Sequence, residues 1–193
     1  MKHIVSILAL IFLAASCASA PVRMPEATLG TMGPDVRAQA DAYYHFVKGN
    51  LLEQSGEFDA ALKEYEKAYK LDPGSAELAL SIASLNIRKG QLEQAAFYAR
   101  KAAELAPDKT QALMLLAGIY TGKNKHDDAI ALYRKVIAID PGEEDTYIYL
   151  GSLFGSLKRY DEALETFKAL EKANPASLMS PYYLGRIYME RRM

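Results

Sequence analysis

The sequence contains no tryptophan and a single cysteine, Cys17, among its 193 residues. One thiol cannot form an internal disulfide, and it has no partner cysteines with which to hold a structural metal ion. Histidine is also scarce, because the chain has three, His3, His45 and His126, and none has a metal-ligand spacing to a second ligand. We therefore expect neither a disulfide framework nor a metal site, and we expect no cofactor.

Neither sign of charge is in excess, because 23 Lys and Arg residues balance 24 Asp and Glu residues, leaving a net charge of −1. Nucleic-acid binding needs a concentrated basic face, so we expect no nucleic-acid partner. Glycine-rich phosphate loops and nucleophile elbows are missing from the sequence as well. We therefore predict that the protein is not an enzyme. Apolar residues make up 50% of the chain, which is enough to build a core.

The N-terminus has the form of a secretory signal peptide, because Lys2 and His3 precede a nearly uninterrupted apolar run over residues 4–15. A run of this length is too short to span a bilayer, which needs ~20 apolar residues. Residues 18–20 have the small-residue spacing of an ordinary signal-peptidase site, but Pro21 after that cut makes it a poor substrate. The N-terminal segment therefore predicts export.

A second processing pattern lies in Leu13-Ala14-Ala15-Ser16-Cys17, which resembles the bacterial lipobox. The resemblance implies that residues 1–16 are removed and that Cys17 becomes a lipid-bearing N-terminus attached to a membrane. The alternative is that Cys17 is a free cysteine inside a discarded leader. Residue 18 is alanine rather than aspartate, so nothing retains the protein in an inner membrane. We predict a lipid-anchored protein of the bacterial cell envelope, in the outer membrane facing the periplasm.

The prolines and glycines of residues 17–36 suggest a flexible tether, and beyond it the sequence repeats itself. Prolines recur at one constant interval, and each is preceded at fixed distances by an alanine and then by an aromatic residue or a second alanine. A column of small residues has the same interval. The four columns are Pro73, Pro107, Pro141 and Pro175; Ala61, Ala95, Ala129 and Ala163; Tyr65, Ala99, Tyr133 and Phe167; and Gly49, Ala83, Ala117, Gly151 and Gly185.

The apolar pattern of each unit predicts a pair of helices, as residues 144–177 illustrate. Two successive apolar faces have helical spacing, and small residues on each, Gly151 and Ala163, allow the two backbones to approach closely. The faces consist of Tyr147, Leu150, Gly151 and Phe154, and of Tyr160, Ala163, Leu164, Phe167 and Leu170. Such a hairpin cannot bury its apolar surface alone and must stack on its neighbours.

The turns inside the units agree with this prediction in part. Gly56, Gly90 and Asn124 tolerate the left-handed backbone conformation in which many helices end. Lys158 fits that position less well.

The units resemble the tetratricopeptide repeat (TPR) family through Leu150-Gly151…Phe154, Leu184-Gly185…Tyr188 and Ala61…Tyr65…Ala68…Pro73. The resemblance implies an all-α fold, a right-handed TPR solenoid of stacked helix-turn-helix hairpins over residues 37–193. We expect four full repeats, 42–75, 76–109, 110–143 and 144–177, and a half repeat, 178–193. The second repeat departs most from the pattern, with Asn86 where an aromatic residue is usual.

The half repeat supplies one helix, in which Pro181 is acceptable because it falls in the first turn. Its apolar residues, among them Leu184, Ile187, Tyr188 and Met189, lack a complete cover. We expect that the native chain continues past Met193, and a homodimer through this C-terminal face is a further hypothesis.

The resemblance also implies that the first helices line a concave groove that holds a partner helix or peptide. An apolar column faces this groove at Phe46, Leu80, Met114, Ile148 and Tyr182, and we add Asn50, Ser84, Leu115, Tyr149 and Tyr183 as neighbouring groove residues. The alternative is that the column is only core. TPR proteins that grip acidic chaperone tails use Lys, Asn and Arg there, and of these only Asn50 is matched, so we do not expect that mechanism.

The function that these features favour is a membrane-anchored scaffold for protein–protein interaction in the bacterial cell envelope, which aids the assembly of a complex. The alternative is the non-catalytic N-terminal TPR region of a longer envelope enzyme or of a secretion, pilus or polysaccharide-export component.

Overall fold

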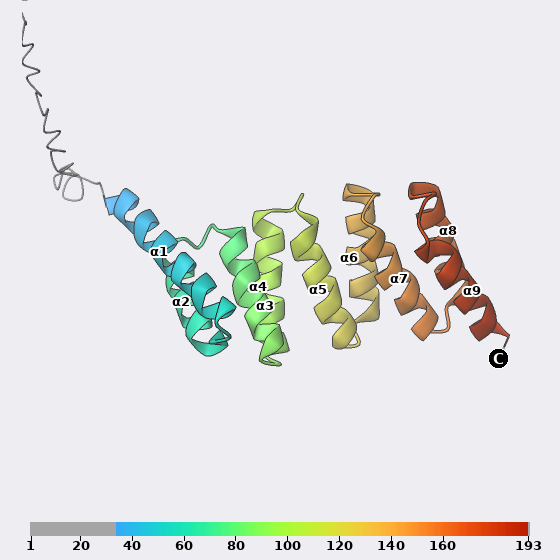
Figure 1. The fold of residues 1–193 in the computed structure, drawn as a ribbon, viewed down its shortest axis with the longest axis horizontal. Helices are drawn as coiled ribbons and strands as arrows, with labels where there is room; N and C mark the ends of the chain where they lie inside the picture. The colour runs from blue at the N-terminus through green and yellow to red at the C-terminus, as the bar shows by residue number, and fades with distance from the viewer. Residues whose placement is uncertain (1–33, 193) are drawn as a thin grey trace, which may run out of the picture. The chain divides into compact units, whose positions relative to one another are not determined.

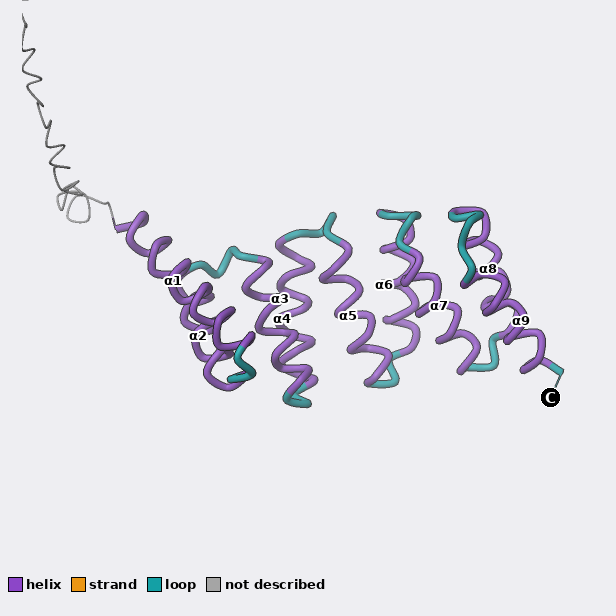
Figure 2. The backbone as a smooth tube through the Cα atoms, in the orientation of Figure 1, coloured by secondary structure: helices purple, strands orange, loops and turns teal. Residues whose placement is uncertain are grey.

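The computed structural model describes residues 34–192, with side chains from residue 36 onward, and this part of the chain consists of helices joined by short turns (Figures 1 and 2). The predicted signal peptide, Cys17 and most of the predicted tether lie outside the described residues. The helices are α1 (Pro34–Gln54), α2 (Phe58–Leu71), α3 (Ala76–Arg88), α4 (Leu92–Leu105), α5 (Thr110–Gly122), α6 (His126–Ile139), α7 (Glu144–Ser156), α8 (Tyr160–Ala173) and α9 (Met179–Arg191).

The helices pair in sequence order as hairpins α1/α2, α3/α4, α5/α6 and α7/α8, and α9 packs on α8 without a partner of its own (Figure 1). Each second helix also packs on the first helix of the next hairpin, so every hairpin is covered by its successor. This arrangement confirms the predicted stack of four hairpins and a single last helix. Helix α1 begins at Pro34, slightly before the expected start of the array, and at 21 residues it is the longest of the described helices.

All four turns inside the hairpins use the same left-handed closure. Gly56, Gly90 and Asn124 have φ of 81°, 71° and 56°, as expected, and Lys158 has the same conformation with φ 59°. The amide that follows then donates to a carbonyl of the last helical turn, as Arg159 N does to Phe154 O at 2.9 Å. The repeat geometry therefore imposes a positive φ on Lys158, which its β-carbon disfavours.

The small-residue column is the point of closest approach within a hairpin. A β-carbon built on Gly49 would lie less than 3.0 Å from the ring of Tyr65, and one built on Gly151 would lie equally close to the ring of Phe167. Both rings are fully buried. Glycine is required at these two positions because the aromatic side chain of the second helix occupies the space of a side chain on the first.

One charged side chain of the core, Glu64, is buried in the first hairpin. Its carboxylate accepts hydrogen bonds from Lys67 at 2.9 Å and Lys48 at 3.2 Å, and it lies 2.6 Å from His45 Nδ1. The hydrogen bond from Lys67, and after it the one from His45, lowers the pKa of Glu64 to about 2. These partners compensate for the burial of the charge.

A ladder of ion pairs links successive hairpins, which the sequence prediction missed. An acidic residue at the start of each second helix recurs at the repeat interval and pairs with a basic residue of the following repeat. The pairs are Asp59–Lys89 at 2.5 Å, Glu93–Lys123 at 2.5 Å, Asp127–Arg159 at 3.8 Å and Asp161–Arg191 at 2.9 Å. Each acid is exposed, so each pair contributes little to stability by itself.

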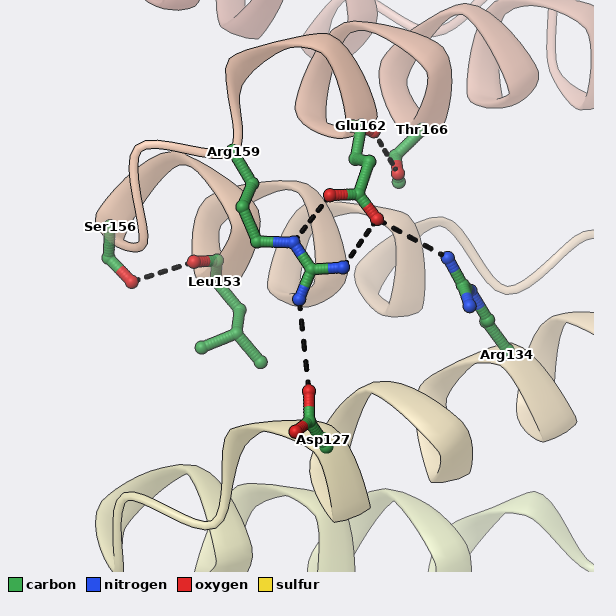
Figure 3. A network of polar contacts seen from close by, with 7 residues as sticks. All are labelled: Asp127, Arg134, Leu153, Ser156, Arg159, Glu162 and Thr166. Carbon is green, nitrogen blue, oxygen red and sulfur yellow. Dashed lines mark hydrogen bonds and ion pairs between the residues drawn. The ribbon is translucent and has the colours of Figure 1, made fainter.

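Figure 3 shows the third pair as part of a larger network. The Arg159 guanidinium donates two hydrogen bonds to Glu162, and Arg134 Nη2 lies 3.7 Å from the same carboxylate. The hydrogen bonds from Arg159 hold the pKa of Glu162 below its usual range. Arg159 also lies over the ring of Phe154, 4.8 Å from its centroid. The network joins α6, through Asp127 and Arg134, to the start of α8.

Candidate partner-binding groove

A hollow of about 630 Å³ lies at the middle of the array. Helices α3, α5 and α7 supply Leu80, Met114 and Tyr149, and α5 contributes more of the lining than any other helix. We call this hollow the groove. Its position over three consecutive first helices is the one that the sequence predicted for a partner site.

The groove carries no charged side chain among the residues that line it. Its polar groups are the amide of Gln111 and the hydroxyls of Thr121, Tyr133 and Tyr149, and the Thr121 hydroxyl is already used because it donates to Ala117 O at 2.9 Å. The walls are otherwise aliphatic. A surface of this kind favours an apolar ligand segment with few polar anchor points.

Two glycines of α5 form an open part of the groove floor. A β-carbon built on Gly118 or on Gly122 would meet no other atom within 4 Å, and both residues are exposed. No packing requirement explains glycine there, and glycine in a helix costs about 1 kcal/mol relative to alanine. The absence of side chains leaves the backbone of α5 accessible from the groove.

Stacked aromatic rings form the α7 side of the groove. The ring of Tyr133, from α6, is buried beneath Tyr149, with centroids 6.2 Å apart and 21° between planes. Burial raises the pKa of the Tyr133 hydroxyl. Tyr149 itself is 52% exposed, so it offers an aromatic face to a ligand while Tyr133 supports it from below.

The structure brings four of the ten predicted groove residues together in this hollow: Leu80, Met114, Leu115 and Tyr149. Leu80, Met114 and Leu115 are half-buried and also pack against core clusters, so these side chains serve the core and the groove at once. Ser84 and Ile148 are half-buried on the same helices but do not line the hollow.

The remaining predicted residues lie at the two ends of the array. Phe46 lines a separate hollow of about 290 Å³ between α1 and α3. Asn50 Oδ1 accepts a hydrogen bond from the Tyr65 hydroxyl at 2.6 Å, so its amide has a structural partner. On α9, Tyr182 is 61% exposed, and Tyr183 stacks on Phe167 with centroids 4.9 Å apart.

The residues that the sequence prediction missed are mainly Gln111, Gly118, Gly122 and Tyr133. Gly118 belongs to the column of Asn50, Ser84, Ser152 and Arg186, and its smallness was the available signal. Tyr133 belongs to the packing column of Tyr65 and Phe167, so its contribution to the groove could not be distinguished from a core role.

Two family models match the chain. The model described as Anaphase-promoting complex, cyclosome, subunit 3 matches residues 88–170, and the model described as Tetratricopeptide repeat matches residues 36–76 and 46–110. The comparison with curated protein sequences found no match.

Among solved structures, the chain is similar to the MamA protein, with a TM-score of 0.71 and 22% identity over 79% of this chain and 83% of that one. It is also similar to YrrB, described as a TPR protein with an unusual peptide-binding site, with a TM-score of 0.65 and 20% identity over 83% and 86%. A third structure, the first TPR of Spaghetti (RPAP3) bound to the HSP90 peptide SRMEEVD, has a TM-score of 0.59 and 22% identity over 62% and 95%.

The fold of the described part of the chain is thus an all-α TPR solenoid, and its repeats match the tetratricopeptide repeat model within residues 36–110. The predicted fold class is confirmed.

Proposed function

We propose that the protein is an interaction scaffold that binds an apolar helix or peptide segment of a partner protein in the groove. The observation that carries this proposal is the uncharged hollow over α3, α5 and α7, in which an exposed tyrosine and an open glycine floor lie among aliphatic walls. The peptide-binding site in the description of YrrB and the peptide bound to the Spaghetti repeat support this use of the fold.

The test is photo-crosslinking in cells with p-benzoylphenylalanine in place of Tyr149. Phe97 is a matched control position, because it is 48% exposed on α4 and does not line the groove. We expect a partner adduct from position 149 and none from position 97. The adduct should disappear in Gly118→Glu, which puts a charged side chain into the groove without touching the core, and persist in Gly118→Ala. Equal adducts in both Gly118 variants would refute binding in the groove.

We further propose that lipid on Cys17 attaches the scaffold to the bacterial envelope, in the outer membrane facing the periplasm. The support is the lipobox-like stretch of residues 13–17 and the apolar leader before it. No helix within residues 34–192 is both long and apolar enough to cross a bilayer. A lipid with several acyl chains would give a stable attachment.

The attachment is tested by fractionating cells that express Cys17→Ser. We expect the variant in the soluble envelope fraction and the unaltered protein in the membrane pellet. A variant that still pellets completely would show that another feature of the protein holds it at the membrane.

A further inference from the structure

Two smaller hollows extend the groove toward α1. The first hollow lies between α1 and α3 and has a volume of about 290 Å³. The second hollow lies between α3 and α5 and has a volume of about 400 Å³. Glu77 lines both of them, and Leu80 and Gln111 line both the second hollow and the groove. The first hollow, the second hollow and the groove therefore form a continuous row along the first helices.

The two small hollows occupy the same position in successive repeats, yet their side chains differ in charge. Four residues of the first hollow are each followed, one repeat interval later, by a residue of the second hollow. These pairs are Phe46 and Leu80, Asp72 and Ala106, Ser75 and Lys109, and Glu77 and Gln111. The repeat geometry thus provides the same recess twice, and only the first has two carboxylates and an aromatic wall.

The two carboxylates of the first hollow have no cationic partner within the described part of the chain. Asp72 follows the last residue of α2 and Glu77 lies in the first turn of α3, and both are exposed. Neither takes part in any of the ion pairs among residues 36–192. The residues that line the first hollow include no basic side chain. A cation that enters this hollow therefore meets negative charge that is not already neutralised.

Aromatic rings on α1 form the other wall of the first hollow. Tyr43 is 68% exposed, whereas Phe46 is half-buried and packs on the core of the first hairpin, 5.9 Å from the ring of Tyr65. An aromatic face attracts a cation, and the aliphatic stem of lysine or arginine packs on apolar surface while its charged end reaches polar groups. Rings on one wall and carboxylates on the other match both parts of such a side chain.

We propose that the first hollow receives a lysine or arginine side chain of the same partner segment whose apolar part lies in the groove. This inference rests on the proposed function, and it adds the charge and the direction of the segment. The second hollow contains Lys109, whose charge opposes a cation there. The basic residue is therefore held at the α1 end of the row, and the apolar part of the segment extends from there toward α7.

The test begins with photo-crosslinking in cells from both ends of the row. p-Benzoylphenylalanine replaces Tyr43 in the first hollow or Tyr149 in the groove. We expect both positions to capture the same partner protein. Mass spectrometry of the adduct from position 43 should find a lysine or arginine within one helical turn, about four residues, of the linked residue.

Neutralising the first hollow measures the contribution of its charge. Asp72→Asn combined with Glu77→Gln should lower the adduct from position 149 by about fivefold, the effect of losing two exposed ion pairs. Asp140→Asn combined with Asp145→Asn is the matched control. It removes two carboxylates from the same repeat positions two units later, where neither residue lines the two small hollows or the groove. The control should leave the adduct unchanged.

A charge exchange then identifies the cation. Replacing the partner's basic residue with glutamate should lower the adduct with the unaltered chain, because a carboxylate then faces Asp72 and Glu77. Adding Glu77→Lys should recover the adduct, since opposite charges face each other again. Circular dichroism of each variant verifies that the helices are formed.

The inference is overturned if neutralising Asp72 and Glu77 leaves the adduct from position 149 unchanged, or if the control pair lowers it equally. It is also overturned if position 43 captures no partner, if no basic residue lies near the linked residue, or if the charge exchange gives no recovery. Gly118→Glu separates the two proposals: if it removes the adduct while neutralisation does not, the groove binds the partner without the first hollow. The absence of any adduct from position 149 overturns both.

Discussion

Replacing Gly151 with alanine tests the packing of the array most directly, because the same substitution has opposite effects at two glycines. In a helix interior, alanine is favoured over glycine by about 1 kcal/mol. At Gly151, the added β-carbon would lie less than 3.0 Å from three atoms of the Phe167 ring. Phe167 is fully buried, so the ring cannot swing into solvent.

The cost of overpacking a core in this way is about 1–3 kcal/mol, and the crowded geometry points to the upper part of that range. After the gain in helix propensity, we expect Gly151→Ala to lower the free energy of unfolding by about 1–2 kcal/mol. For a chain of this size the midpoint of thermal unfolding then falls by about 2–8 °C. Gly118→Ala, where the β-carbon meets nothing, should raise the midpoint by about 2–4 °C.

The assay is thermal unfolding followed by circular dichroism, with Gly151→Ala, Gly118→Ala and the unaltered protein measured side by side. Adding Phe167→Leu to Gly151→Ala should recover part of the loss, since the smaller side chain leaves room for the β-carbon. A midpoint for Gly151→Ala equal to or above that of the unaltered protein would refute the reasoning, because it would mean that the ring of Phe167 does not fill the space over the glycine.

Two further predictions concern charge and backbone conformation. Glu64→Gln should destabilise the protein by about 1–3 kcal/mol at pH 7. Because the pKa of Glu64 falls from 4.5 to about 2 on folding, this advantage of the unaltered protein is complete above pH 4.5 and is lost as the pH falls toward 2. Urea unfolding measures the difference in free energy of unfolding between the two proteins, and the same difference at pH 7 and at pH 3 would contradict the prediction. Lys158→Gly should stabilise the protein by about 0.5–1 kcal/mol because it relieves a positive φ, whereas Lys158→Ala should give no such gain in the same urea measurement.

Most of the fold could be predicted from the constant interval between the repeats. A constant spacing between units, two apolar faces in each unit and a turn position suited to left-handed backbone led to the observed hairpins and to the turns at Gly56, Gly90 and Asn124. These features are local, so a sequence displays them directly. Lys158 shows the limit, because its conformation is set by the packing of α7 on α8 and not by its own preference.

The groove was harder to predict, because a small rotation of each helix about its own axis decides which of its side chains line the groove. Met114 and Leu115 are adjacent in sequence, and both reach the groove while packing against different core clusters. Asn50 has a suitable side chain and position, yet the Tyr65 hydroxyl engages it. The ion-pair ladder was missed for a related reason: its acids keep the repeat interval, but Arg159 replaces the basic residue expected at position 157.

Gly118, Gly151 and Gly185 show that small residues at repeated positions can have different structural roles. In sequence all three are glycines in first helices, and two of them occupy the same column. Packing against the neighbouring helix requires glycine at position 151, because the ring of Phe167 fills the space in front of it. Gly118 has open space on the groove side and Gly185 has open space at the end of the array, where no described helix covers it. In a helix, a glycine that nothing covers costs stability without any gain in packing. Gly118 lies in the groove to which the proposed function assigns a partner segment, so Gly118→Glu tests that assignment, with Gly118→Ala as its control.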